Sequence, residues 1–149
     1  MNPTLPSEST AAKPRRNAFA RFAPPIVRTL MGLAFVVFGL NGFLNFIPQP
    51  STPLAPRAVA FLTALVNTGY MLKLIAVTQL VAGAMLVLNA FVPLALALLA
   101  PFLVNSLAFH FCLEPTGRPM AVVFTLLELY LAWRYRASFR PMLAWRARP

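Results

Sequence analysis

The chain has 149 residues, of which 59% are hydrophobic and 11% charged, and its 13 Lys and Arg residues outnumber its three Asp and Glu residues. A soluble domain of this size has too much surface to cover with so few charges, so the composition indicates an integral membrane protein. The basic residues flank apolar runs and match no recognition module, which argues against nucleic acid as a partner.

The N-terminal half of the chain predicts a tail, a membrane span and a shorter helix. Residues 1–25 are rich in Pro, Ser and Ala and lack an apolar face, so we expect a disordered basic tail. A first span is predicted from about Ile26 to Ile47, close to the ~20 residues that cross the hydrocarbon core. The prolines of the PQPSTPLAP stretch interrupt the helix. The apolar segment Arg57–Tyr70 is too short for a span and is interpreted as an interfacial or re-entrant helix on the outer side.

Three further spans are predicted in the rest of the chain, at about Met71–Leu88, Pro93–Cys112 and Met120–Tyr135. The expected fold is therefore all-α. It is a transmembrane four-helix bundle over residues 26–136, with a short extra helix between its first two spans. Residues 137–149 are expected to form a basic cytoplasmic C-terminal tail.

The basic residues predict the orientation. Ten of the 13 Lys and Arg residues lie before or at the start of the first apolar run or after the last one, and three lie between, at Arg57, Lys73 and Arg118. The positive-inside rule then places both termini in the cytoplasm. The preference for Arg over Lys is typical of a high-GC bacterial genome, so the predicted location is the bacterial inner membrane, with several spans.

Polar side chains inside the predicted spans are the candidate site residues, because a polar group in hydrocarbon faces protein or water. Their predicted depths converge on the outer half of the bundle, which suggests either an outward-opening pocket or polar contacts that hold the helices together. Gln79 also has small neighbours at helical spacing, Ala76, Ala82 and Gly83, as a close helix–helix contact requires. The ligand-binding candidates are Asn41, Asn45, Lys73, Gln79, Asn105, His110 and Glu128.

Most of these candidates also have a structural interpretation. Amides such as Asn41, Asn45 and Gln79 commonly form interhelical hydrogen bonds, and Lys73 is suited to reach the membrane surface. Glu128 is the strongest functional candidate, since a carboxylate near mid-membrane must pair, be neutralised or reach water. We expect Glu128 to form a pocket floor with Gln79 and Asn105, and His110 to lie at the pocket lip.

No catalytic or metal constellation is present in the sequence. His110 and Glu114 supply two candidate ligands, too few for a metal site, and Glu114 with Arg118 is expected to cover the polar turn EPTGRP. The single cysteine, Cys112, excludes an internal disulfide and a dithiol redox site. Intrinsic enzymatic activity is therefore not expected.

Several stretches together resemble the DoxX-like family of small bacterial four-helix membrane proteins, over about residues 28–136. They are GLNGFLNF, TGYMLKLI, NAFVPLAL and AFHFCLEPTGRP. The resemblance implies a four-helix membrane fold, and some relatives are associated with membrane redox assemblies such as thiosulfate:quinone oxidoreductase. Such proteins often carry an acid in the second span where this chain has Gln79, a departure that weakens a proton-transfer role there.

Two functions from different classes follow as hypotheses. In the first, the protein is an accessory subunit of a membrane redox system and binds a quinone or a similar amphipathic molecule, with His110 or Asn105 hydrogen-bonded to a carbonyl. In the second, it is a non-enzymatic assembly or chaperone-like membrane protein that recognises other transmembrane segments. The lipid bilayer is a partner in both, and a membrane-protein partner or a second copy of the chain is a candidate in both.

Overall fold

The computed structural model describes residues 18–48 and 53–139, and within these residues the chain is entirely helical. This confirms the all-α prediction. The elements are α1 (Ala18–Leu44), α2 (Pro56–Asn67), α3 (Met71–Val87), α4 (Val92–Cys112), the 3₁₀ turn η1 (Pro115–Gly117), α5 (Arg118–Arg134) and α6 (Arg136–Phe139).

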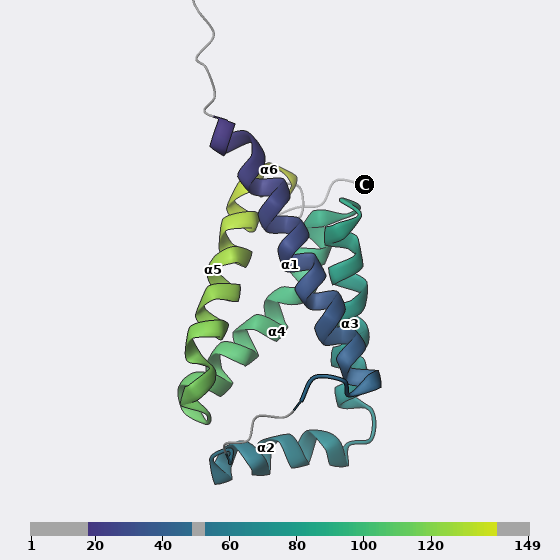
Figure 1. Ribbon diagram of the computed structural model, residues 1–149, viewed down its shortest axis with the longest axis vertical. Coiled ribbons are helices and arrows are strands. Elements are labelled where there is room, and N and C mark those ends of the chain that lie inside the picture. Colours follow the sequence, from purple (N-terminus) through teal and green to yellow (C-terminus); the bar gives the residue numbers. More distant parts are fainter. Residues whose placement is uncertain (1–17, 49–52, 140–149) are drawn as a thin grey trace, which may run out of the picture.

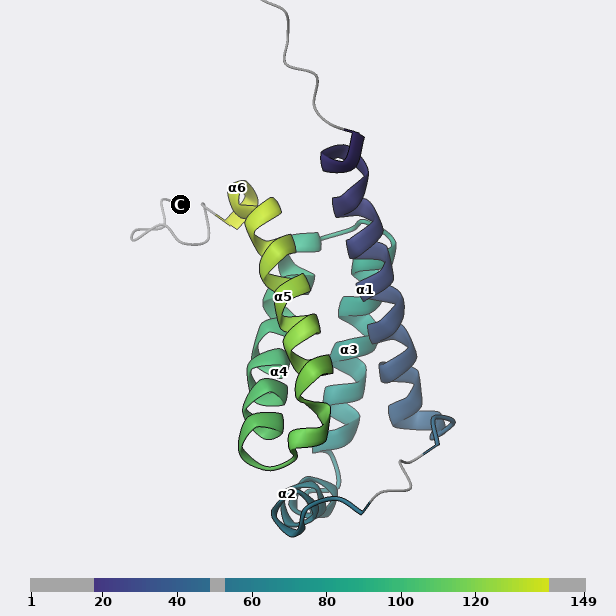
Figure 2. The ribbon, with the colours of Figure 1, turned by 60° about the vertical axis from the view of Figure 1, so that its left-hand side comes forward.

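Helices α1, α3, α4 and α5 lie side by side, and α2 lies across one end of them (Figures 1 and 2). The start of α1 and the short helix α6 are at the opposite end of the bundle (Figure 1). Helix α2 is the extra helix expected between the first two spans, and it meets α3 at an angle of 88°. The hydroxyl of Thr68 shapes this bend, because it donates to the Leu65 carbonyl (2.6 Å) and accepts from the Met71 N–H (3.0 Å).

Two described helices are long and apolar enough to cross a membrane, Phe22–Leu44 within α1 and Val92–Cys112. A third is added if the bent pair α2–α3 counts as one broken span. Large apolar side chains are exposed around the bundle, among them Val104, Leu126 and Leu129. Such a surface is unfavourable in water and favourable against lipid, so it supports a multi-pass membrane protein.

The first helix begins earlier than predicted. Residues 18–25 were expected to be disordered, but α1 starts at Ala18 and contains Pro24 and Pro25. The Ala and Arg residues of this segment favour helix. Pro24 and Pro25 are the seventh and eighth residues of α1, so each removes one helical hydrogen bond, and the helix continues through them. The remaining tail residues, 1–17 and 140–149, lie outside the described part of the chain.

Small residues bring α1 and α3 into backbone contact. A Cβ atom at Gly39 would lie 2.7 Å from the Leu80 backbone nitrogen, and one at Gly83 would lie 2.7 Å from that of Val36. Neither position can carry a side chain without separating the helices, which is the usual reason for small residues between membrane helices. The close contact predicted around Gln79 is confirmed, since Ala76, Ala82 and Gly83 are buried.

The buried core lies among all four bundle helices. Phe35 and Met31 of α1 are its largest residues, each 1% exposed, and α4 contributes more core residues than any other helix. The core members are Met31, Phe35, Ala82, Leu86, Val92, Ala95, Leu96, Leu99, Leu103 and Leu131.

Candidate ligand-binding pocket

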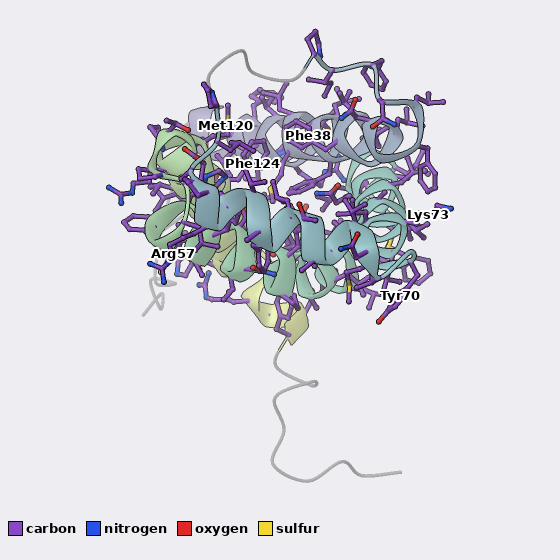
Figure 3. The ribbon with its side chains drawn as sticks, turned by 90° about the horizontal axis from the view of Figure 1, so that it is seen from below. Phe38, Arg57, Tyr70, Lys73, Met120 and Phe124 are labelled. Carbon is purple, nitrogen blue, oxygen red and sulfur yellow. The ribbon has the colours of Figure 1, made fainter. Side chains whose placement is uncertain are left out.

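A pocket of about 180 Å³ lies among α1, α4 and α5, towards the end of the bundle that α2 covers. We call it the α1–α5 pocket. Figure 3 shows Phe38 of α1 on the same side of the bundle as Met120 and Phe124 of α5, away from Tyr70 and Lys73. The lining residues are Phe35, Phe38, Phe102, Leu103, Ser106, His110, Met120, Ala121 and Phe124.

Aromatic rings form most of the pocket wall and fix its shape. The Phe35 ring meets Phe102 and Phe124 edge to face, with centroids 6.0 and 5.5 Å apart, and Phe38 meets Phe124 at 5.8 Å. These contacts join three helices and favour a planar ring as an additional neighbour. Phe38 and Met120 are 38% and 59% exposed, so the pocket opens sideways between α1 and α5, where a bilayer would lie.

The polar end of the pocket comes from α4, where Ser106 and His110 are four residues apart and share a face. His110 Nδ1 lies 3.0 Å from the Glu114 carbonyl oxygen. A carbonyl only accepts, so Nδ1 carries the hydrogen, and Nε2 of a neutral ring is left with a lone pair. The polar end therefore offers a hydroxyl, which donates or accepts, and an imidazole nitrogen.

Gly117 makes room for this histidine. A Cβ atom at Gly117 would overlap the His110 ring. The backbone φ of Gly117 is −87°, which any residue adopts, so the requirement for glycine comes from the ring and not from the backbone. Arg118 closes the same turn, because its Nε and Nη2 donate to the carbonyls of His110 (3.2 Å) and Phe111 (3.1 Å) at the end of α4.

Glu114 links this turn to α2. Its Oε2 accepts the Ala55 N–H at 2.9 Å and its Oε1 accepts the Thr116 hydroxyl at 2.8 Å. Ala55 is the N-cap residue of α2, so the carboxylate lies where the helix dipole favours a negative charge. These hydrogen bonds, with that of Ala55 the stronger influence, hold the pKa of the Glu114 carboxyl below its ordinary value of 4.5. Glu114 thus forms a polar contact within the turn, as expected, and also attaches the start of α2 to the end of the bundle.

A second pocket, of about 210 Å³, lies beneath α2. We call it the α2 pocket. It shares Phe102 and Ser106 with the α1–α5 pocket, so these two side chains separate the two cavities. Asn105, which is exposed, is its one amide. The lining residues are Phe61, Leu62, Leu65, Leu72, Ile75, Phe102, Asn105, Ser106 and Phe109.

The two asparagines of α1 act at the end of that helix. Asn41 Oδ1 accepts the Ile47 N–H at 2.7 Å, and Asn45 adopts a left-handed conformation with φ 49°. Both are features of helix termination, for which asparagine is one of the favoured residues. Lys73 is exposed at the start of α3 (Figure 3). The structure places none of these three residues in the α1–α5 pocket.

The structure does not bring Gln79, Asn105 and Glu128 together as the floor of one pocket. Asn105 lines the α2 pocket, Gln79 is 7% exposed against α1, and Glu128 is 7% exposed on α5. Within the described residues no hydrogen bond joins any two of them, and Glu128 Oε2 has no partner. The interior is filled instead by phenylalanine rings from α1, α4 and α5. Of the seven candidates, His110 alone lines the α1–α5 pocket.

Sequence reasoning missed Arg28 as a buried residue. It is 8% exposed, and its Nε and Nη1 have no hydrogen-bond partner among the described residues. The sequence analysis counted it only as a determinant of topology. Its position three and seven residues before the core residues Met31 and Phe35 was the available signal, because that spacing places it on the same helix face.

Within the described part of the chain no three His, Cys, Asp or Glu side chains gather into a metal-binding group, and Cys112 is exposed. Comparison of the chain with protein-family models, with curated proteins and with solved structures finds no match. The resemblance to the DoxX-like family therefore remains a prediction.

Proposed function

We propose that the protein is a four-span membrane protein of the DoxX-like type that binds a ring-bearing amphipathic molecule, such as a quinone, in the α1–α5 pocket. In this proposal it serves as an accessory subunit of a redox system in the bacterial inner membrane. The observation that carries the proposal is the shape of the pocket, an aromatic cavity with Ser106 and His110 at one end and an opening towards lipid.

The size of the pocket supports a single ring. Its volume of about 180 Å³ is close to that of an engineered apolar cavity of ~150 Å³ that binds benzene. A quinone ring would lie between the phenylalanine edges, its carbonyl would accept from the Ser106 hydroxyl, and a hydroquinone hydroxyl would donate to His110 Nε2. An apolar tail would leave through the opening beside Phe38 and Met120.

The four-span arrangement is supported by the bundle itself. Helices α3 and α5 each have 17 residues, which gives a length of about 26 Å, slightly less than the hydrocarbon thickness. A bilayer accommodates such a difference by thinning locally at modest cost. In this proposal the basic residues at both ends of the chain favour cytoplasmic termini, which would leave α2 at the outer surface.

Binding of a short-tailed benzoquinone to protein in lipid nanodiscs tests the proposal. Ala121 is 5% exposed and lines the pocket, so Ala121→Leu should fill the ring site and abolish saturable binding. Ala108 is exposed on α4, so Ala108→Leu is the matched control and should bind as the natural chain does. Ser106→Ala removes one neutral hydrogen bond and should weaken binding about fivefold.

Equal quinone binding by the natural chain and Ala121→Leu would contradict the proposal. Purification in mild detergent separates it from the alternative function. A co-purifying quinone supports the ring site, whereas a stoichiometric membrane-protein partner without a small molecule favours an assembly protein.

A further inference from the structure

Two charged side chains of opposite sign are buried in the bundle, and each has polar atoms with no hydrogen-bond partner in the part of the chain that the structure describes. Arg28 on α1 is 8% exposed and Glu128 on α5 is 7% exposed. Within the described residues Arg28 Nε and Nη1 and Glu128 Oε2 make no hydrogen bond. Neither residue lines the α1–α5 pocket, so the proposed ligand site does not account for them.

Both residues lie on helix faces that point into the same core. Arg28 precedes Met31 by three residues and Phe35 by seven, and both of these are 1% exposed. Glu128 precedes Leu131, which is fully buried, by three residues. Met31, Phe35 and Leu131 belong to one core cluster, so the faces that carry the two charges are directed towards each other.

The depths of the two residues also agree. Phe35 and Phe124 are in contact, with ring centroids 5.5 Å apart, and α1 and α5 run in opposite directions (Figure 2). From this contact Arg28 lies seven residues, about 10 Å, along α1, and Glu128 lies four residues, about 6 Å, along α5. Both displacements point to the end of the bundle opposite α2. The two residues therefore differ in depth along the bundle axis by roughly 4 Å, which is less than the length of an arginine side chain.

Among the described residues neither charge has another candidate partner. A guanidinium stays protonated in proteins, so Arg28 needs an acceptor wherever it is buried. The chain has three acidic residues. Glu8 lies outside the described residues, and Glu114 is bound to Ala55 and Thr116 at the α2 end. Apart from Arg28, the basic side chains whose burial the structure describes, such as Lys73 and Arg134, are exposed.

We propose that Arg28 and Glu128 form a charge pair inside the bundle that holds α1 against α5 at the end opposite α2. Within the described residues Arg28 Nε and Nη1 and Glu128 Oε2 have no hydrogen-bond partner, so formation of the pair requires rotation about side-chain bonds. Because the α1–α5 pocket lies between the same two helices, the pair also sets the spacing of its walls. The pair itself does not depend on which molecule, if any, the pocket binds.

A charge exchange in detergent-solubilised protein tests the pair. Arg28→Glu and Glu128→Arg, made singly, each leave two like charges in the bundle and should lower the melting temperature by about 10 °C. The double exchange restores opposite charges and should recover more than half of the combined loss. As a control, Arg28→Gln with Gln79→Leu should be additive, because Ala76 and Leu80 beside Gln79 lie against Gly39, eleven residues along α1 from Arg28. The proposal is overturned if the double exchange lowers the melting temperature by as much as the two single exchanges added together.

Cross-linking keeps the proposal testable if the single variants do not fold. In a Cys112→Ser background, a short bifunctional thiosulfonate should join the two cysteines of the Arg28→Cys, Glu128→Cys variant. After proteolysis between α1 and α5, the linked fragments should stay together and migrate as one band in gel electrophoresis. The control pairs Arg28→Cys with Leu129→Cys, since Leu129 is 60% exposed on the outer face of α5. Equal yields from the two pairs, or linkage of the control alone, would show that Glu128 does not face Arg28.

Discussion

The carboxylate of Glu114 accepts a hydrogen bond from the backbone N–H of Ala55, 59 residues earlier in the chain, at 2.9 Å. This one contact ties the start of α2 to the turn between α4 and α5. The same turn holds His110, through the hydrogen bond between His110 Nδ1 and the Glu114 carbonyl. The position of α2 and the orientation of the pocket histidine therefore depend on one short segment.

The Glu114 contact predicts how the attachment of α2 changes with pH. The pKa of this carboxyl is lower in the folded protein than its ordinary value of 4.5, so its stabilising effect is complete above that value and is lost as pH falls through the folded pKa. Hydrogen exchange at the Ala55 amide should accelerate, beyond the intrinsic pH effect, as pH falls below 4.5. In Glu114→Gln this additional acceleration should be absent and exchange should be faster at neutral pH.

Thr116→Val is the control for that measurement, since it removes the hydrogen bond that has the smaller effect on the pKa of Glu114 and leaves the carboxylate and Ala55 in place. It should retain most of the pH dependence. If Glu114→Gln and the natural chain exchange alike at every pH, Glu114 does not hold α2.

Gly117→Ala should displace His110 while leaving the bundle folded. The added methyl group would overlap the imidazole ring, whereas the backbone at Gly117 accepts any residue. His110 is the single histidine of the chain, so one set of imidazole signals reports its environment by NMR. We expect these signals to shift and quinone affinity to fall, with helix content unchanged.

Gly69→Ala provides the contrast for Gly117→Ala. Gly69 has open space around it but a φ of +74°, so its substitution should reduce stability by about 1 kcal/mol through backbone strain and leave the His110 signals unchanged. Unchanged His110 signals in Gly117→Ala would contradict the packing around the ring.

Gly39→Ala should weaken the contact between α1 and α3. Its Cβ atom would lie within 3 Å of backbone atoms of Ala76 and Leu80, and backbone cannot rotate away as a side chain can. Such overpacking costs roughly 1–3 kcal/mol, measurable as a lower melting temperature in detergent. Leu33→Phe, on the lipid-facing side of the same helix, should have little effect, because Leu33 is 48% exposed.

Reporter fusions test the four-span arrangement. A fusion in the turn at Thr116 should report the periplasm, and fusions at Ala90 and Pro149 should report the cytoplasm, because α4 and α5 each connect opposite ends of the bundle (Figure 1). A cytoplasmic signal at Thr116 would remove two of the proposed spans.

The sequence by itself determined the helical class, the approximate helix positions and a close helix–helix contact around Gln79, while the structure identified α1 as its partner. Long apolar runs, the prolines between Ile47 and Pro56, and the small residues around Gln79 are local signals, and local chemistry decides helix length, helix ends and the faces that can approach closely. His110 was expected at the lip of a pocket and lines the α1–α5 pocket, although the expected floor of Glu128, Gln79 and Asn105 does not form. The predicted start of the first helix was too late, because the Pro, Ser and Ala composition of residues 1–25 indicated disorder whereas α1 begins at Ala18 and continues through Pro24 and Pro25.

Only the tertiary structure decided which polar groups meet. The contact of Glu114 with Ala55 joins segments 59 residues apart, and the burial of Arg28, at 8% exposure, depends on how the other helices pack around α1. Depth and helical spacing were known for Gln79, Asn105 and Glu128, but the rotation of each helix about its axis was not. That rotation follows from the packing of phenylalanine rings and glycines across the whole bundle, a property that no single segment encodes.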